Sequence, residues 1–319
     1  MIARTAHDTL MRLARGFPII AITGPRQSGK TTLARSAFPE KAYLSLEDPD
    51  VRLMAETDPR GLLSRFPDGA ILDEAQRAPE LFSFLQTRVD ADVRPGSYIL
   101  TGSQQFGLLS GITQSLAGRV GMVQLLPFSL DELLKADKLP EDLDEVMFRG
   151  LYPPLYDRDL SPGDWCAGYV NTYIERDVRQ LIAVRDLSAF QRFLRMCAAR
   201  SGQLLNLSSL ASDCGITHNT AAAWLSVLEA SYIVFLLRPH FQNYNKRLVK
   251  TPKLYFCDTG LAVWLLGIRE SGQTIATDFF ASLKKWSELS GREDKPAWLV
   301  YGGDRELQNG NVTIIPWRS

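Results

Sequence analysis

Eight consecutive residues near the start of the chain have the spacing of a phosphate-binding loop. They match G-x-x-x-x-G-K-[ST] at each fixed position and are Gly24, Pro25, Arg26, Gln27, Ser28, Gly29, Lys30 and Thr31. Glycines let the backbone curl so that its N–H groups point toward an anion, and the lysine can reach the terminal phosphates. We expect these residues and Thr32 to bind ATP, with Lys30 also acting in catalysis and the Thr31 hydroxyl on Mg²⁺.

Two adjacent acids, Asp73 and Glu74, end the short apolar segment 69–72. A phosphate-binding loop needs a second oxygen ligand for its magnesium, on a neighbouring strand. Asp73 is predicted to hold the metal, and Glu74 to orient or deprotonate the attacking water. The pair therefore predicts hydrolysis as well as binding, the alternative being a strand end that happens to be acidic.

Further polar residues are weaker candidates. Thr101 and Ser103 end another apolar segment, where they can meet the γ-phosphate or the water, or form an ordinary turn. Arg119 could stabilise transition-state charge on the nucleotide of a neighbouring copy, or form a surface salt bridge. Arg176 and Arg179 are second candidates for that role, and a solvated helix face explains them equally well.

The elements that must position these residues follow an alternating pattern. Segments 17–23, 69–73, 96–101 and 120–126 are predicted strands, and 79–89 and 106–116 are predicted helices. This pattern favours an α/β fold, a P-loop parallel sheet with helices on both faces. Ligands of such sheets bind beyond the carboxyl ends of the strands. We expect this domain to span residues 1–160, beginning with an amphipathic helix.

After a loop rich in proline and glycine, the pattern turns helical. Residues 205–228 are predicted to form helix, turn, helix, with Ser208 or Ser209 as the first cap, Gly215 in the turn and Thr217 as the second cap. Strand-like segments 232–237 and 246–256 would add a hairpin. The combination predicts a winged helix over residues 161–256.

The partner of this domain stays open between DNA and protein. Residues 191–256 carry eight basic and two acidic side chains, a surplus that suits a polyanion or an acidic domain. A winged helix on DNA would use the start of its second helix on bases or phosphates and its hairpin on the backbone. The residues concerned are Thr217, His218, Asn219 and Thr220, then Lys246, Arg247 and Lys250 within 246–250.

The whole composition is that of an ordinary globular protein. The 319 residues hold 36 basic and 36 acidic side chains, with 45 % hydrophobic residues. The longest apolar run near the middle, residues 232–237, is far shorter than a membrane span. Four cysteines without a C-x-x-C pair favour reduced thiols over a zinc site or disulfides. We therefore expect a cytoplasmic protein.

With these residues in place, the chain resembles a family of bacterial and archaeal AAA-type P-loop ATPases that carry a C-terminal domain of unknown function. The resemblance rests on the stretches GPRQSGKTTL (24–33), AILDEAQRAPELF (70–82), ILTGSQQF (99–106), SLAGRV (115–120), LLPFSLDEL (125–133) and TYIERDVRQL (172–181), and on two more within 215–261. It implies an ATP-binding core in which Lys30, Thr31, Asp73 and Glu74 have the roles given above, followed by a winged helix.

The sequence departs from that family after residue 268. Relatives continue with a nuclease-like α/β unit that contains a Glu-x-Lys pair, whereas here Ile268, Arg269 and Glu270 lead directly into the tail. We expect no metal-dependent nuclease site, and a shortened α/β module over residues 257–319. The favoured function is a Mg²⁺-dependent ATPase that has no membrane contact, can form homo-oligomers and couples nucleotide state to the winged helix. The alternative is a nucleotide-gated regulatory or protein-binding module with negligible turnover.

Overall fold

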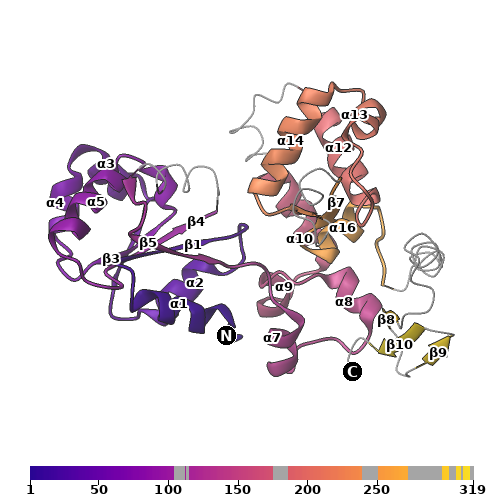
Figure 1. The fold of residues 1–319 in the computed structure, drawn as a ribbon, viewed down its shortest axis with the longest axis horizontal. Coiled ribbons are helices and arrows are strands. Elements are labelled where there is room, and N and C mark those ends of the chain that lie inside the picture. Colours follow the sequence, from indigo (N-terminus) through magenta and orange to yellow (C-terminus); the bar gives the residue numbers. More distant parts are fainter. Residues whose placement is uncertain are drawn as a thin grey trace.

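A parallel sheet of five strands forms the N-terminal part of the molecule in the computed structural model (Figure 1). The structure describes residues 1–103, 112, 115–174, 186–238 and 251–271, and the backbone of 297–301, 307–309 and 312–316. The strands are β1 (Ile19–Thr23), β2 (Ala42–Ser45), β3 (Ala70–Asp73), β4 (Tyr98–Gly102) and β5 (Val120–Gln124). The predicted parallel sheet is confirmed, and β2 is a strand that we did not predict.

The strand order is β2-β3-β4-β1-β5, which corrects one expectation. The strand that carries Asp73 is not a neighbour of β1, because β4 pairs with β1 along its whole length and lies between them. The carboxyl ends of all five strands still lie at one edge, since every pairing in this sheet is parallel. Residues that follow β1, β3 and β4 are therefore brought together at that edge.

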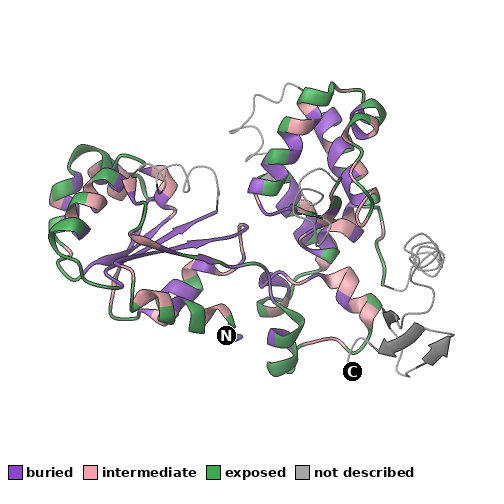
Figure 2. Cartoon of the chain, viewed as in Figure 1, coloured by how far each residue is buried: buried purple, intermediate pink, exposed green. Residues whose placement is uncertain are grey.

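Helices cover both faces of the sheet, and alternate residues of β1 pack against each layer. Ile20 and Ile22 face the layer of α1 and α2, whereas Ile19 and Ala21 face that of α3, α4 and α5. This alternation is the two-residue period of a strand buried on both sides, and Figure 2 shows the sheet as buried. The helices are α1 (Ala6–Ala14), α2 (Lys30–Ala37), α3 (Pro49–Thr57), α4 (Pro59–Ser64), the short η1 (Ala75–Arg77) and α5 (Leu81–Ala91).

Three short helices lead from the sheet into a helical region. They are α7 (Leu130–Lys135), α8 (Leu143–Arg149) and α9 (Pro154–Asp157). The helical region has its own core, centred on fully buried Phe190 and Phe193. It contains α10 (Pro162–Tyr169), η2 (Val170–Ile174), α12 (Leu187–Ala199), α13 (Leu207–Cys214), α14 (His218–Ala230), the antiparallel hairpin β6 (Val234–Leu237) and β7 (Lys253–Phe256), and α16 (Thr259–Leu265).

The predicted helix, turn, helix is present as α13 and α14, but the prediction of its first cap is wrong. Gly215 ends α13 in the left-handed conformation, and the Thr217 hydroxyl accepts from the N–H of Thr220, as expected. The first cap is Asn206, whose side chain accepts from the N–H of Ser209 at 3.0 Å. Asparagine caps as well as serine does, and the helix begins two residues earlier than the serines suggested.

The C-terminal described segments form a separate small sheet. Its order is β8 (Ala297–Tyr301), β10 (Val312–Pro316), β9 (Leu307–Asn309), with β10 parallel to β8 and antiparallel to β9. The sequence predicts a shortened α/β module in this tail. Within the described part of the chain, no helix combines the length and the apolar character that a membrane span requires.

Candidate functional site

The phosphate loop, residues 24–31, joins the end of β1 to the start of α2. A Cβ on Gly24 would lie 2.0 Å from the carbonyl oxygen of Leu125, so only glycine fits against this part of the chain. Gly29 has a φ of 91°, a left-handed conformation that glycine adopts at little cost, and it is the residue before α2. Both fixed glycines of the motif are thus required by the geometry. The loop presents backbone N–H groups at a helix N-terminus, as an anion site needs.

Lys30 lies inside this loop. Its Nζ donates to the carbonyl oxygens of Gly24 at 3.0 Å and Pro25 at 2.8 Å, and the residue is only 6 % exposed. These two carbonyls hold the ammonium group at the centre of the curled backbone. A phosphate bound at the loop would meet this charge directly.

The hydroxyl and carboxylate predicted to hold the metal lie together. Thr31 Oγ1 donates to Asp73 Oδ1 at 2.9 Å across the edge of the sheet. Thr101 donates to the same oxygen, and the Tyr43 hydroxyl donates to Asp73 Oδ2 at 2.7 Å. Hydroxyl and carboxylate oxygens are the donors that Mg²⁺ prefers, so the residues fit this ion. Tyr43 was not predicted, because nothing in the local sequence places β2 beside β3.

Glu74 is held in an uncommon backbone conformation. Its φ is 53°, which for a residue with a side chain is rare and persists only where the surroundings fix it. Here Ser103 donates to Glu74 Oε2 from its hydroxyl at 3.0 Å, and the Gln76 amide donates to the same oxygen. The Glu74 N–H in turn donates to Thr101 Oγ1 at 3.3 Å. The structure thus places Thr101 and Ser103 on the two acids; their contact with a phosphate stays a prediction.

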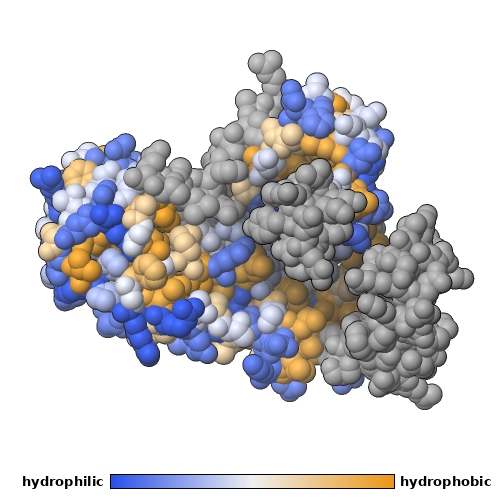
Figure 3. Space-filling view, in the orientation of Figure 1, coloured by the Kyte–Doolittle hydropathy of each residue, from blue (hydrophilic) through white to orange (hydrophobic). Residues whose placement is uncertain are grey.

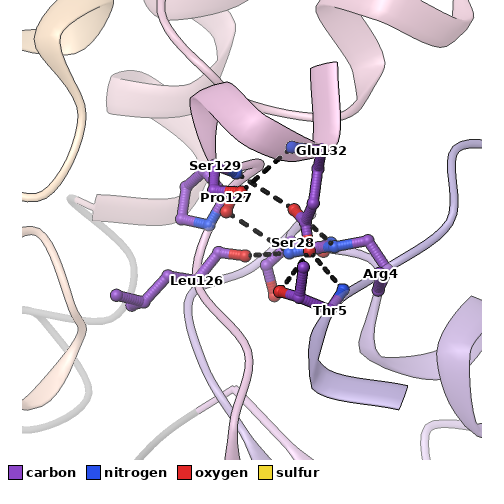
Figure 4. A network of polar contacts seen from close by, with 7 residues as sticks. All are labelled: Arg4, Thr5, Ser28, Leu126, Pro127, Ser129 and Glu132. Atoms are coloured by element: carbon purple, nitrogen blue, oxygen red, sulfur yellow. Dashed lines mark hydrogen bonds and ion pairs between the residues drawn. The ribbon is translucent and has the colours of Figure 1, made fainter. Parts of the chain in front are cut away.

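A buried ion pair supports the loop from the N-terminal segment (Figure 4). Arg4 donates to the carbonyl oxygens of Ser28 at 2.7 Å and Leu126, and its Nε lies 3.2 Å from Glu132 Oε2. Glu132, 4 % exposed, also accepts from the N–H of Thr5 and of Ser129, which makes it the third residue of a capping box for α7. Burial raises the pKa of Glu132, but these hydrogen bonds and Arg4 outweigh it and the net shift is downward.

A cavity of about 740 Å³ opens beside the start of α2. Residues of four segments line it: the N-terminus with Arg4, the α2 face of Thr32, Leu33 and Ser36, α7 with the preceding Phe128, and α9 with Pro153 and Asp157. Its size is in the range of small-molecule sites, and its walls are mainly apolar. A smaller cavity of about 500 Å³ lies near Thr31 and Tyr43.

Arg119 lies at the amino ends of the strands, opposite the phosphate loop. Its backbone precedes β5, where the next residue pairs with Ile19 at the start of β1. Its guanidinium forms a two-point ion pair with Asp90 of α5, at 2.5 and 2.8 Å. Arg119 is therefore not near the phosphate loop of its own chain, and a role on a neighbouring copy stays a prediction. Arg176, Arg179, Lys246, Arg247 and Lys250 lie outside the described residues.

Two family models match this chain in succession. The model of an AAA domain matches residues 16–134, and that of a domain of unknown function (DUF8612) matches residues 140–272. The chain joins an AAA domain to DUF8612. The AAA domain contains the whole phosphate loop, both acids and Arg119, and the matched DUF8612 segment contains α8 to α16.

Relatives of both parts are found among bacteria. An uncharacterized protein of Mycobacterium bovis and one of Mycobacterium tuberculosis are each 35 % identical to this chain over 270 residues. The match covers 83 % of this chain, which spans 60 % of the length of these relatives. Among solved structures, a Walker-type ATPase of Pyrococcus abyssi matches 83 % of this chain and 96 % of its own, with a TM-score of 0.54 and 18 % identity. The AAA domain and the DUF8612 domain that follows it thus share their fold with that protein.

Proposed function

We propose that the AAA domain binds ATP with Mg²⁺ and hydrolyses it. The contact that carries this proposal is the hydrogen bond of 2.9 Å between Thr31 Oγ1 and Asp73 Oδ1. It joins the last residue of the phosphate loop to the acid that ends β3. A metal-binding hydroxyl and carboxylate at this spacing form the magnesium half of a site whose other half is the loop itself.

Each residue then has a distinct role in the reaction. The N–H groups of the loop and of Thr32 bind the phosphates, and Lys30 stabilises the negative charge that develops on the transferred phosphoryl group. Mg²⁺, when bound, neutralises phosphate charge from the side of Thr31 and Asp73. The Glu74 carboxylate, which Ser103 orients through Oε2, accepts a proton from the attacking water or aligns it for attack.

The nucleoside of ATP would bind in the cavity beside α2. It begins at Gly29 and Thr32, next to the phosphate loop, and extends between the N-terminal segment and α7. Its apolar walls suit a base, and Arg4 and Glu132 add polar groups to its lining. An ATP molecule whose phosphates occupy the loop would place its ribose and base here.

Substitution of two residues tests binding and turnover separately. Lys30→Ala is expected to lower both ATP affinity and turnover, by about a hundredfold for turnover. Glu74→Gln is expected to keep ATP binding and to slow hydrolysis to a similar degree, because the amide cannot accept the proton. The control is Glu80→Gln, which neutralises an exposed acid before α5. Normal phosphate release by the Lys30 variant would contradict the proposal.

The alternative is a nucleotide-gated regulatory or protein-binding module. It predicts ATP binding by the same residues with no phosphate release, even at high protein concentration. Measuring the specific ATPase rate against protein concentration separates the two. A rate that rises with concentration and is lost in Arg119→Ala would also support homo-oligomers in which Arg119 acts on the neighbouring nucleotide.

The helical region extends this proposal to a partner. Thr217, His218 and Asn219 are exposed at the start of α14, and Figure 3 shows hydrophilic residues along the upper edge of that region. This exposure is compatible with a winged helix that binds DNA, and equally with a protein contact. Phosphate contacts release counterions, so DNA affinity that does not change with salt would favour protein. We also propose three domains with the limits 1–160, 161–256 and 257–319. The four free cysteines favour a cytoplasmic location.

A further inference from the structure

The tip of the phosphate loop is joined to the helical region by a side-chain hydrogen bond. Trp165 Nε1, on α10, donates to Gln27 Oε1 at 2.8 Å. Gln27 has a φ of 61°, in the left-handed region that residues with a side chain seldom adopt. Such a conformation persists where neighbouring groups hold it, and the indole N–H is a group that does so here.

The indole itself has little freedom to move. Trp165 is 7 % exposed and stacks on Tyr169 with ring centroids 4.8 Å apart, and the ring of Tyr152 lies 4.6 Å away. The hydroxyls of the two tyrosines lie 3.1 Å apart. All three rings belong to the buried core that includes Phe190 and Phe193. A displacement of Trp165 would therefore disturb the packing of the helical region as a whole.

Two further contacts join the same parts of the molecule. The Tyr169 hydroxyl lies 3.5 Å from the carbonyl oxygen of Arg26, the residue before Gln27. The Tyr232 side chain, two residues after α14, lies beside the Thr23 side chain at the end of β1. Tyr232 also has a positive φ, of 57°. The end of β1 and the tip of the loop thus both lie against the helical region.

We propose that Trp165 is a positioning residue for the nucleotide site, which holds the phosphate loop through Gln27 and links ATP binding to the packing of the helical region. This inference rests on the proposed ATP binding and adds the residues that transmit it. Because linkage is reciprocal, a contact that favours the binding conformation of the loop must in turn be stabilised when ATP binds. The Trp165–Gln27 pair is then a route by which the nucleotide reaches α10 and the helices packed on it.

The test measures ATP dissociation constants for four variants of the full chain in the presence of Mg²⁺. Trp165→Phe keeps the aromatic ring and removes the N–H donor, and Gln27→Ala removes the acceptor. Each is expected to weaken ATP binding about threefold to tenfold, the range for loss of one hydrogen bond. The double variant should bind no more weakly than the poorer single variant, because both remove the same interaction.

The matched control is Trp224→Phe. Trp224 is a second tryptophan buried in the same core, with edge contacts to Phe190 at 5.4 Å and Phe193 at 5.5 Å. Its replacement should lower the melting temperature and leave the ATP dissociation constant unchanged. ATP should also slow amide hydrogen exchange in α10 of the wild type, and less so in Trp165→Phe, an effect that loss of core packing alone would not produce.

The outcomes distinguish this inference from the function on which it rests. A wild type that binds no ATP overturns both. A wild type that binds ATP, with unchanged affinity in Trp165→Phe and Gln27→Ala, overturns the role of Trp165 alone. Multiplicative losses in the double variant would do the same, since they would show that the two side chains act independently. Gln27→Ala, on a surface loop, keeps the test valid if Trp165→Phe does not fold.

Discussion

Three hydroxyl groups donate hydrogen bonds to Asp73, and one of them, that of Tyr43, comes from the edge strand β2. The Arg35 guanidinium lies over the Tyr43 ring, 4.9 Å from its centroid, and fixes its position. Burial, together with Asp73, raises the pKa of Tyr43 to about 12. The phenol therefore remains a neutral donor throughout the pH range of an assay. Its hydrogen bond turns Asp73 Oδ1 toward Thr31.

We expect Tyr43→Phe to raise the Mg²⁺ concentration for half-maximal ATP hydrolysis several-fold, because Asp73 loses the bond that orients it. The loss of one hydrogen bond corresponds to about threefold to tenfold. The control is Tyr98→Phe, since the Tyr98 hydroxyl is buried and has no hydrogen-bond partner among the described residues. Magnesium titration of the ATPase rate measures both. Equal magnesium requirements in the two variants would argue against an orienting role.

The buried ion pair between Arg4 and Glu132 should contribute to stability. Arg4→Met would leave Glu132 buried beside the donors Thr5 and Ser129 but without its cation, and would free the carbonyl of Ser28. We expect the free energy of unfolding to fall by about 2 kcal/mol, less than for a fully isolated buried charge. Arg94→Met removes exposed ion pairs with Asp68 and Asp92 and should cost under about 1 kcal/mol. Urea unfolding of both variants gives the comparison.

Among the elements, α13 offers a direct test of its cap. Asn206→Ala should lower the free energy of unfolding of the helical region by about 1 kcal/mol, since it removes the acceptor for the Ser209 N–H. Ser208→Ala, at an exposed position inside the helix, should change it by less than about 0.5 kcal/mol. Thermal unfolding followed by circular dichroism measures both. A larger effect for Ser208 would restore the cap predicted from the sequence.

The elements differ in how far local sequence determines them. The strand, phosphate loop and α2 follow from contiguous residues, because glycine spacing and a β-branched run are local signals. Strand β2 and the order of the sheet do not, since they depend on pairings between segments tens of residues apart. The same distinction explains the site. Lys30, Thr31 and Asp73 could be predicted from motifs, whereas Tyr43 and Arg4 reach it from separate elements that no local pattern connects.

At the scale of the whole molecule, Asp258 ties the helical region to the connection after α8. It caps α16 by accepting from Leu261 N–H at 2.8 Å, and it accepts from Leu151 N–H at 2.7 Å. Gly150 makes room for it, because a Cβ there would lie 2.6 Å from the carboxylate, and Gly260 makes room for the backbone of Arg149 and Gly150. Burial raises the pKa of Asp258 to about 6, although these N–H donors oppose the shift.

This shift predicts a pH dependence with a definite sign. Asp258 binds its proton more tightly in the folded chain than in the unfolded chain, where its pKa is about 4. Its contribution to the free energy of unfolding therefore falls as the pH rises from about 4 to about 6 and is constant above that. Two pKa units correspond to about 3 kcal/mol. Denaturant unfolding of the wild type and Asp258→Asn, which keeps a capping side chain, should show a difference between them that changes by this amount.

The connection between β5 and α7 meets the phosphate loop through its backbone. The carbonyl of Leu125 limits residue 24 to glycine, and the carbonyls of Leu126 and Pro127 accept from Arg4. Carbonyl oxygens are present whatever the side chain. This segment should therefore tolerate many substitutions and few changes of length, since inserting one residue would shift every carbonyl. Among natural relatives, its conserved property would be its length.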